Sequence, residues 1–127
     1  MDDTAATRNI AFHRTTLESA LEILKHGLKS RASQQLEANC EAIAWGNRVE
    51  HTFVSIKGVQ QNWARDGVQL AFDLDAIEAS GLKVHADDFG AHDVGDRQVL
   101  GDIPASMVLG IVSDEWVKNA GYICLMD

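Results

Sequence analysis

The sequence predicts an α+β fold with an N-terminal helical half followed by a mostly antiparallel, split sheet. Apolar residues at helical spacing dominate the first part of the chain, and short runs rich in β-branched residues follow one another in the second. Helices and strands therefore do not alternate as they would around a doubly wound parallel sheet. The one proline and the scattered glycines are typical of turns and not of a linker, so we expect a single domain over residues 1–127.

The first two predicted elements are a short strand over residues 10–13, which ends on His13, and a helix directly after it. The helix is indicated by four apolar residues at helical spacing, Leu17, Ala20, Leu21 and Leu24. The hydroxyl of Thr15 or Thr16 can accept a hydrogen bond from the first turn and so cap the helix. Gly27 is a natural end, because glycine readily adopts the backbone conformation found after a helix.

A second helix is expected from Ser30 or Ser33 to about Trp45, where the letters WGN interrupt it. The clearest strand is VQLAFDLD, residues 68–75, because alternate positions are apolar. Residues 86–96 are a loop by composition. The other expected elements, in chain order, are a strand over 51–56, a short helix within 57–67, a helical turn over 76–81, strands over 82–86, 97–100 and 107–112, a helical turn over 114–121 and a final strand over 122–126.

Composition narrows the class of function. The chain has 19 acidic and 11 basic residues, a formal net charge of −8, whereas a nucleic-acid-binding surface needs clustered basic residues. An acidic surface serves solubility or docking on a basic protein partner. No stretch approaches the ~18 apolar residues of a membrane span, and residues 1–9 lack the features of a secretory signal. Cys40 and Cys124 have no paired spacing, so we expect reduced thiols in a cytoplasmic protein.

Chemical motifs with fixed spacing are not found in the sequence. It contains no zinc-ligand spacing, no phosphate-binding P-loop and no GxSxG nucleophile motif. His85 and His92 flank an acidic loop, but without a recognised ligand spacing the favoured interpretation is a solvated loop, and no metal is expected. The remaining signal is the order of three features along the chain. A strand that ends in histidine comes first, then a strand that ends near a serine and is followed by a helix with an aromatic residue, and last an aspartate before a Gly-x-Ile-Pro turn.

This order resembles the ADP-ribosyltransferase-like superfamily over most of the chain. The stretch FHRTTLESALEILKHGLKSR is similar to the family's opening, in which the first strand ends in His or Arg and the next helix ends in Gly-Leu. HTFVSIKGVQQNWARDGVQLAFDLD resembles its central strand, serine and helix, followed by a strand that ends in Phe-Asp. DRQVLGDIPASMV resembles the segment that carries the catalytic glutamate before Gly-x-Ile-Pro. The resemblance implies that NAD is bound as a substrate.

The resemblance implies a role for five residues. His13 would hydrogen-bond the adenosine ribose of NAD, with Thr15 beside it, and Ser55 would lie on the strand below the nicotinamide. Trp63 stands where the family often has a tyrosine that stacks on the nicotinamide ring. Asp96 stands where the catalytic glutamate is expected, and its side chain is one methylene shorter. Each residue type also has an ordinary use: a structural histidine, a core tryptophan or an aspartate in a turn.

Two functions from different classes follow from these observations. The first is an NAD-dependent mono-ADP-ribosyltransferase that moves ADP-ribose to a protein partner, as a toxin or phage effector does. The second is a non-catalytic acidic inhibitor with the same fold, which blocks a basic or nucleic-acid-binding partner. A further relative, the RNA 2′-phosphotransferase, shares the His-x-Thr opening, but it needs basic residues for its RNA phosphates, which a net charge of −8 disfavours. The oligomeric state is left open.

Overall fold

The computed structural model describes residues 9–37, 49–56, 58, 67–86 and 95–122, in which six strands and three α-helices form an α+β structure. The strands are β1 (Ile10–Thr15), β2 (His51–Ser55), β3 (Val68–Asp73), β4 (Val84–Ala86), β5 (Asp96–Leu100) and β6 (Val108–Val112). The helices are α2 (Leu17–His26), α4 (Leu74–Ala79) and α5 (Asp114–Asn119), with a short 3₁₀ helix η1 at Ala105–Met107. No helix within these ranges has the length and apolar character needed to cross a membrane.

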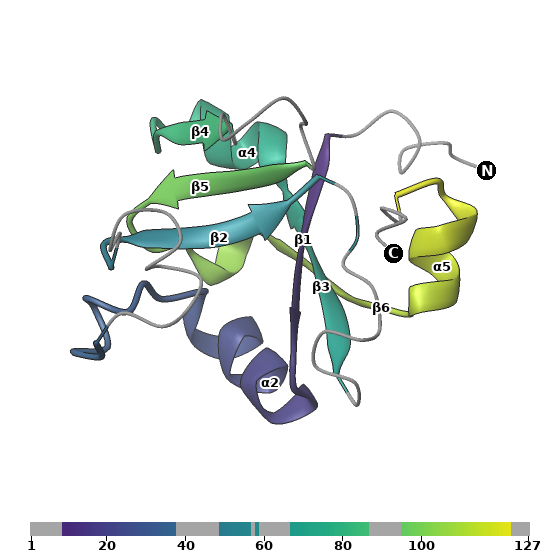
Figure 1. The fold of residues 1–127 in the computed structure, drawn as a ribbon, viewed down its shortest axis with the longest axis horizontal. Helices are drawn as coiled ribbons and strands as arrows, with labels where there is room; N and C mark the ends of the chain where they lie inside the picture. The colour runs from purple at the N-terminus through teal and green to yellow at the C-terminus, as the bar shows by residue number, and fades with distance from the viewer. Residues whose placement is uncertain (1–8, 38–48, 57, 59–66, 87–94, 123–127) are drawn as a thin grey trace.

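The strands form one sheet in the order β4-β5-β2-β1-β3-β6, and every pairing is antiparallel. The antiparallel sheet predicted from the sequence is therefore confirmed. The sheet divides between β1 and β2, where Phe12 opposite Ser55 is the registered pair, whereas β1 pairs with β3 along its whole length. Figure 1 shows β2 and β5 crossing β1 and β3 steeply at this junction. Two halves of the sheet thus diverge from one point.

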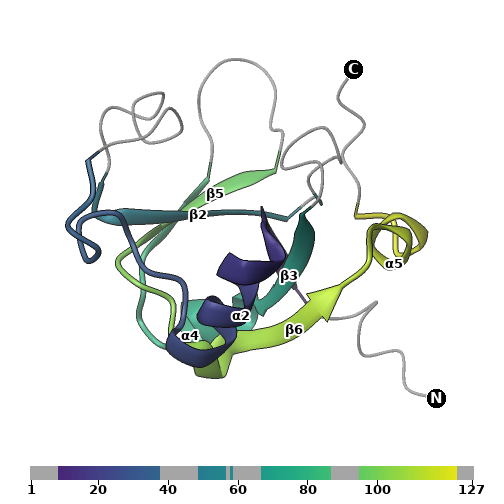
Figure 2. The same cartoon turned by 90° about the horizontal axis from the view of Figure 1, so that it is seen from below.

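Helices lie on both sides of the part of the sheet formed by β1, β3 and β6 (Figure 2). On one face, α2 and α4 pack over a core formed by buried residues that include Ala20, Ile23, Leu70, Phe72, Ile77, Val99 and Ile103. On the other face, α5 covers a smaller cluster that includes Ile10, Phe12, Ala71 and Val117. Alternate residues of β1 and β3 therefore point to opposite cores, since successive side chains of a strand point to opposite faces.

Helix α2 begins and ends as the sequence predicts. The Thr16 hydroxyl accepts a hydrogen bond from the Ser19 backbone N–H at 3.2 Å, which satisfies one of the free donors of the first turn. Gly27 follows the last turn with φ of 84°, a left-handed value that favours glycine. A side chain at Gly27 would also collide with the backbone of Ile103 and Ala105. The end of α2 is therefore fitted closely against the turn before η1.

The helix predicted from Ser30 or Ser33 to about Trp45 is wrong in its first part, because residues 31–35 form turns. The Ser30 hydroxyl accepts a hydrogen bond from the Ser33 backbone N–H at 3.1 Å, a local bond that competes with helix formation. Gln35 has φ of 58°, in the left-handed region where a right-handed helix cannot continue. The remainder of this predicted helix lies outside the described residues.

Other expectations differ at element ends. The described residues of the first half hold one helix, while α4 and α5 lie in the second half, so the predicted helical half is not seen there. Strand β3 stops at Asp73, because the Asp73 side chain accepts a hydrogen bond from the Ala76 backbone N–H at 3.1 Å and caps α4. Tyr122 is not in a strand, and residues 123–126 of the predicted final strand lie outside the described residues, as does most of the helix predicted within 57–67.

Candidate functional site

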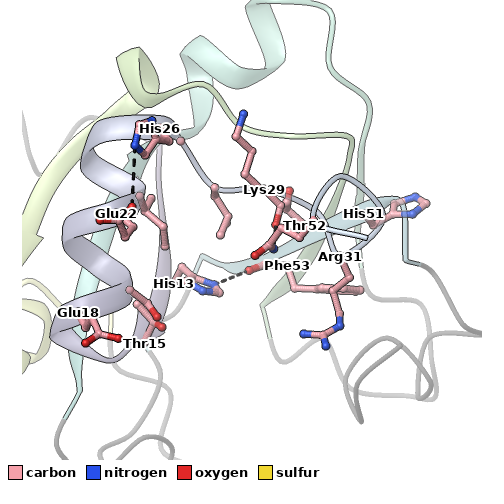
Figure 3. Close-up of a pocket in the computed structure, with 15 residues that line it drawn as sticks. His13, Thr15, Glu18, Glu22, His26, Lys29, Arg31, His51, Thr52 and Phe53 are labelled. Carbon is pink, nitrogen blue, oxygen red and sulfur yellow. Dashed lines mark hydrogen bonds and ion pairs between the residues drawn. The ribbon is translucent and has the colours of Figure 1, made fainter. Parts of the chain in front are cut away.

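A cavity of about 560 Å³ opens on the α2 side of the sheet, beside the junction of β1 and β2 (Figure 3). Its walls come from the end of β1, one face of α2, residues 27–34 and the first half of β2. Neighbouring strands that diverge leave space between their side chains and the covering helix. The split in the sheet therefore positions the cavity, and His13 and Thr15 both line it.

His13 is held in one orientation in this cavity. Its Nδ1 donates a hydrogen bond to the backbone carbonyl oxygen of Phe53 on β2 at 2.9 Å. A carbonyl oxygen only accepts, so Nδ1 carries the ring proton and the Nε2 of the neutral ring is an acceptor. Burial lowers the pKa of His13, and this outweighs the hydrogen bond to Phe53, which raises it. The ring is therefore neutral at pH 7 and brings an acceptor nitrogen to the cavity.

The α2 wall of the cavity is polar although α2 is rich in leucine. Glu18, Glu22 and His26 lie at successive i, i+4 positions and line the cavity together, as Figure 3 shows. The His26 Nε2 lies 3.9 Å from a Glu22 carboxylate oxygen. Sequence reasoning missed these three residues as site candidates. The sequence did contain a signal for them. Glu18, Glu22 and His26 recur at helical spacing on a face of the helix that holds neither its buried residues nor its exposed leucines.

Residues 27–34 form the wall opposite β1, and they are held by the turn before η1. Leu28 and Ile103 exchange two backbone hydrogen bonds, each 2.9 Å long. The Asp102 carboxylate accepts from the Ser30 backbone N–H at 2.8 Å and from the Ser33 hydroxyl at 3.0 Å. Asp102 therefore fixes the turn that carries Arg31 and Gln34, which both line the cavity.

The electrostatics of Asp102 agree with this role. Partial burial alone would raise the pKa of the carboxyl group. Hydrogen bonds from Ser30 and Ser33, together with the charge of Lys29, lower it by more, so the net pKa lies below its usual value. The Lys29 ammonium is 3.8 Å from Asp102. The carboxylate is thus bound in its ionised form by the segment that it orders.

Replacing Asp102 with alanine is expected to lower the free energy of unfolding by about 1–2 kcal/mol at pH 7, because two donors lose their acceptor. The pKa of Asp102 is lower in the folded protein, so its contribution is complete above the unfolded value of about 3.9. This contribution to stability is lost as the pH falls through the pKa that Asp102 has in the folded protein. Urea unfolding at several pH values measures this effect, and the exposed Glu37→Ala is the matched control. If the free energies of unfolding of Asp102→Ala and of the wild type differed by the same amount at pH 3 as at pH 7, the role of the charge would be contradicted.

The other predicted site residues are placed as follows. Ser55 is buried at the end of β2 and is registered with Phe12, so it lies on the α5 face of the sheet and not among the residues that line the cavity. Asp96 begins β5, and its backbone is registered with Ser55, while its side chain is outside the described part of the chain. Trp63 lies outside the described residues. Ser55 thus lies opposite Phe12, the residue before His13, whereas Asp96 lies one strand further away, because β5 pairs with β2 and not with β1.

Within the described ranges, no group of three or more His, Cys, Asp or Glu side chains is arranged to hold a metal ion. The cationic groups at the cavity are Lys29 and Arg31, and Arg31 donates a hydrogen bond to the backbone carbonyl of Glu37. No protein-family model matches this chain, and no curated protein is significantly similar to it.

Proposed function

We propose that the cavity beside His13 binds NAD and that the chain is a small ADP-ribosyltransferase-like protein that transfers ADP-ribose to a protein partner. One observation carries the proposal. A neutral imidazole, oriented by the Phe53 carbonyl, stands at the junction of a split antiparallel sheet and lines a cavity of about 560 Å³. That volume lies within the roughly 300–1,000 Å³ of small-molecule sites.

The chemistry of the cavity fits the adenosine half of a dinucleotide. Ribose hydroxyls are donors, and the His13 Nε2 is an acceptor of the kind that recognises them. Thr15 lines the cavity beside His13, and Glu18 and Glu22 add acceptors for hydroxyl or amino groups. Lys29 and Arg31 supply positive charge for a diphosphate. The cavity therefore contains partners for the sugar, the base and the phosphates.

In the proposed reaction, the bond between nicotinamide and the ribose C1′ breaks, and nicotinamide leaves with the bonding electrons. Positive charge develops on the ribose, as in glycoside cleavage. Asp96 is the carboxylate assigned to stabilise this charge. A nucleophile of the partner forms the new bond to C1′ and loses its proton. The support for Asp96 is the resemblance alone, because β5 pairs with β2 and its start lies one strand further from His13 than Ser55 does.

The second candidate function is that of a non-catalytic acidic inhibitor with the same fold. Two observations favour it: the net charge of −8, and an aspartate where the resemblance expects a glutamate. Such a protein would dock on a basic partner in the cytoplasm, and raising the salt concentration would slow its association.

Calorimetric titration of the purified chain with NAD, followed by mass spectrometry of a cell lysate incubated with protein and NAD, separates the two. Saturable binding with a mass increase of one ADP-ribose on a lysate protein supports the transferase. Binding without modification supports the inhibitor. An absence of binding at millimolar NAD would contradict both the cavity assignment and the transferase.

The affinity for NAD is expected to be constant from pH 8 to about 6.5 and to fall at lower pH. The pKa of His13 lies below its usual value of about 6.5, so the acceptor at Nε2 is lost only under more acidic conditions. Below the lowered pKa, affinity should fall up to tenfold per pH unit. Titrations at several pH values measure this, with His26→Gln as a control that keeps the profile. A decline already between pH 8 and pH 7 would contradict the assignment.

A further inference from the structure

Most of the exposed large apolar side chains of the described residues lie on two neighbouring elements, and the exceptions are Leu36 and Leu100. Leu17, Leu21 and Leu24 of α2 are 51%, 48% and 38% exposed. Leu109 and Ile111 of β6 are 43% and 38% exposed. Figure 2 shows α2 beside β6. We call these five residues the β6 patch. Large apolar side chains that cluster on a surface mark an interaction site more often than single ones do.

Strand β6 ends the sheet, and no strand of the described residues pairs with its outer edge. Ile111 is registered with Leu70, a member of the core beneath α2, so Ile111 lies on the same face of the sheet as α2. The edge sequence Val-Leu-Gly-Ile-Val at 108–112 has no charge and no proline. Natural edge strands usually carry charges, prolines or bulges that hinder pairing with another chain, and of these β6 has the register shift between Gly110 and Val108.

The patch lies on the opposite side of α2 from the cavity. The cavity is lined by Glu18, Glu22 and His26, whereas Leu17, Leu21 and Leu24 repeat at i, i+4 and i+7 on another face of the helix. A partner on the patch would therefore leave the cavity open. The patch is an independent feature and does not depend on the function proposed for the cavity.

We propose that the β6 patch binds a second copy of this chain, with the two β6 strands paired antiparallel about Gly110. A two-fold interface requires a surface that is complementary to itself. Strand β6 meets this requirement, because pairing about Gly110 places Val108 opposite Val112 and Leu109 opposite Ile111. Gly110 lacks a side chain, and a Cβ built on it would have no atom within 4 Å, so its backbone is open to approach.

Charge complementarity favours a second copy over a basic or acidic partner. Within 108–112 no charged residue is present, so the paired strands themselves bring no like charges together. Beside the leucines, α2 carries Glu18 near its start and Lys25 near its end. The same two-fold axis makes the two α2 helices antiparallel, so the Glu18 end of one helix lies toward the Lys25 end of the other. Opposite charges then lie on either side of a shared leucine contact.

The first test is the mass of the full chain in solution by sedimentation velocity between 1 and 100 µM. A dimer is expected at the upper end. Ile111→Lys should shift the dimer–monomer midpoint at least tenfold toward monomer, because two lysines would enter the shared edge. Leu100→Lys is the matched control, since Leu100 is 40% exposed on β5, away from β6, and it should leave the midpoint unchanged. Thermal melts of both variants show that they fold.

The second test is the register. Opposite residues of an antiparallel pair have Cα atoms about 4.5–5.5 Å apart, within the range of a disulfide. A mixture of Leu109→Cys and Ile111→Cys proteins should form a crosslinked dimer under mild oxidation, well above the yield of wild type with its native Cys40 and Cys124. A chain that stays monomeric at 100 µM, or an Ile111→Lys variant that dimerises as tightly as the wild type, would overturn the proposal. So would a crosslinking yield no higher than that of wild type.

Discussion

Replacement of Asp96 by asparagine is expected to reduce NAD consumption by about 10²–10³-fold while NAD still binds. The substitution keeps the shape of the side chain and removes its charge. Deleting one electrostatic contact to a developing transition-state charge typically has an effect of this size. The amount of nicotinamide released, followed by chromatography, measures the rate, and calorimetry measures binding. An Asp96→Asn variant that retains the full rate would show that another acid carries the charge.

A second substitution at the same position, Asp96→Glu, distinguishes a transferase from an inhibitor. It restores the residue that the resemblance expects and lengthens the side chain by one methylene. If the wild type is inactive and the Asp96→Glu variant is active, the chain is a transferase fold that has lost its activity through one residue. A displacement of about 1 Å at a reacting centre can change a rate by roughly 10²-fold, so the gain should be large.

The neighbouring acids are alternative carriers of the charge if Asp96→Asn keeps its rate. Asp102 is already bound by Ser30 and Ser33, and its pKa is lowered mainly by these hydrogen bonds against the opposing effect of burial. Its role as the anchor of residues 27–34 makes it a positioning residue. Asp93 lies outside the described residues and is the remaining candidate in that segment of the chain.

Replacement of His13 by asparagine is expected to weaken NAD binding by about 1–3 kcal/mol, or about 5–150-fold, because a ligand hydroxyl loses its acceptor. The asparagine amide nitrogen can occupy the place of Nδ1 and still donate to the Phe53 carbonyl. The side-chain hydrogen bond from β1 to the Phe53 carbonyl on β2 is then kept, so the melting temperature should change little. Calorimetry with NAD and a thermal melt of the same sample measure both quantities.

The matched variant is His13→Gln, whose amide reaches the position of Nε2 but not that of Nδ1. It should retain part of the NAD affinity and lose the hydrogen bond to Phe53, which contributes roughly 1 kcal/mol to stability. A His13→Asn variant that binds NAD as the wild type does would show that the imidazole serves only to join β1 and β2.

Local signals in the sequence predicted the parts of the fold that depend on neighbouring residues. Thr16 caps α2 and Gly27 ends it, because both effects act within a single turn of chain. The strand at Val68–Asp73 was recognisable from alternation, although its end was set by the Asp73 cap of α4. His13 was singled out as the last residue of its strand, which is wrong because β1 continues to Thr15, but the structure does place His13 in a cavity.

Contacts between distant parts of the chain explain what the sequence did not predict. Residues 30–37 have helical composition, but Asp102 binds Ser30 and Ser33 from 72 and 69 residues away and holds them in turns. Thr52 and His51 line the cavity because the sheet splits between β1 and β2, and no local pattern marks that split. The cavity wall is therefore a product of tertiary structure.

The central claim is that a neutral His13, oriented by the Phe53 carbonyl, presents its Nε2 to NAD. Long-range ¹H–¹⁵N correlation spectra of the imidazole nitrogens at pH 7.5, with His13→Asn used for assignment, test it most directly. We expect Nδ1 to be protonated, Nε2 to be bare, and the Nε2 signal to move on addition of NAD until the site is saturated. A proton on Nε2, or His13 signals that do not move at millimolar NAD, would contradict the claim.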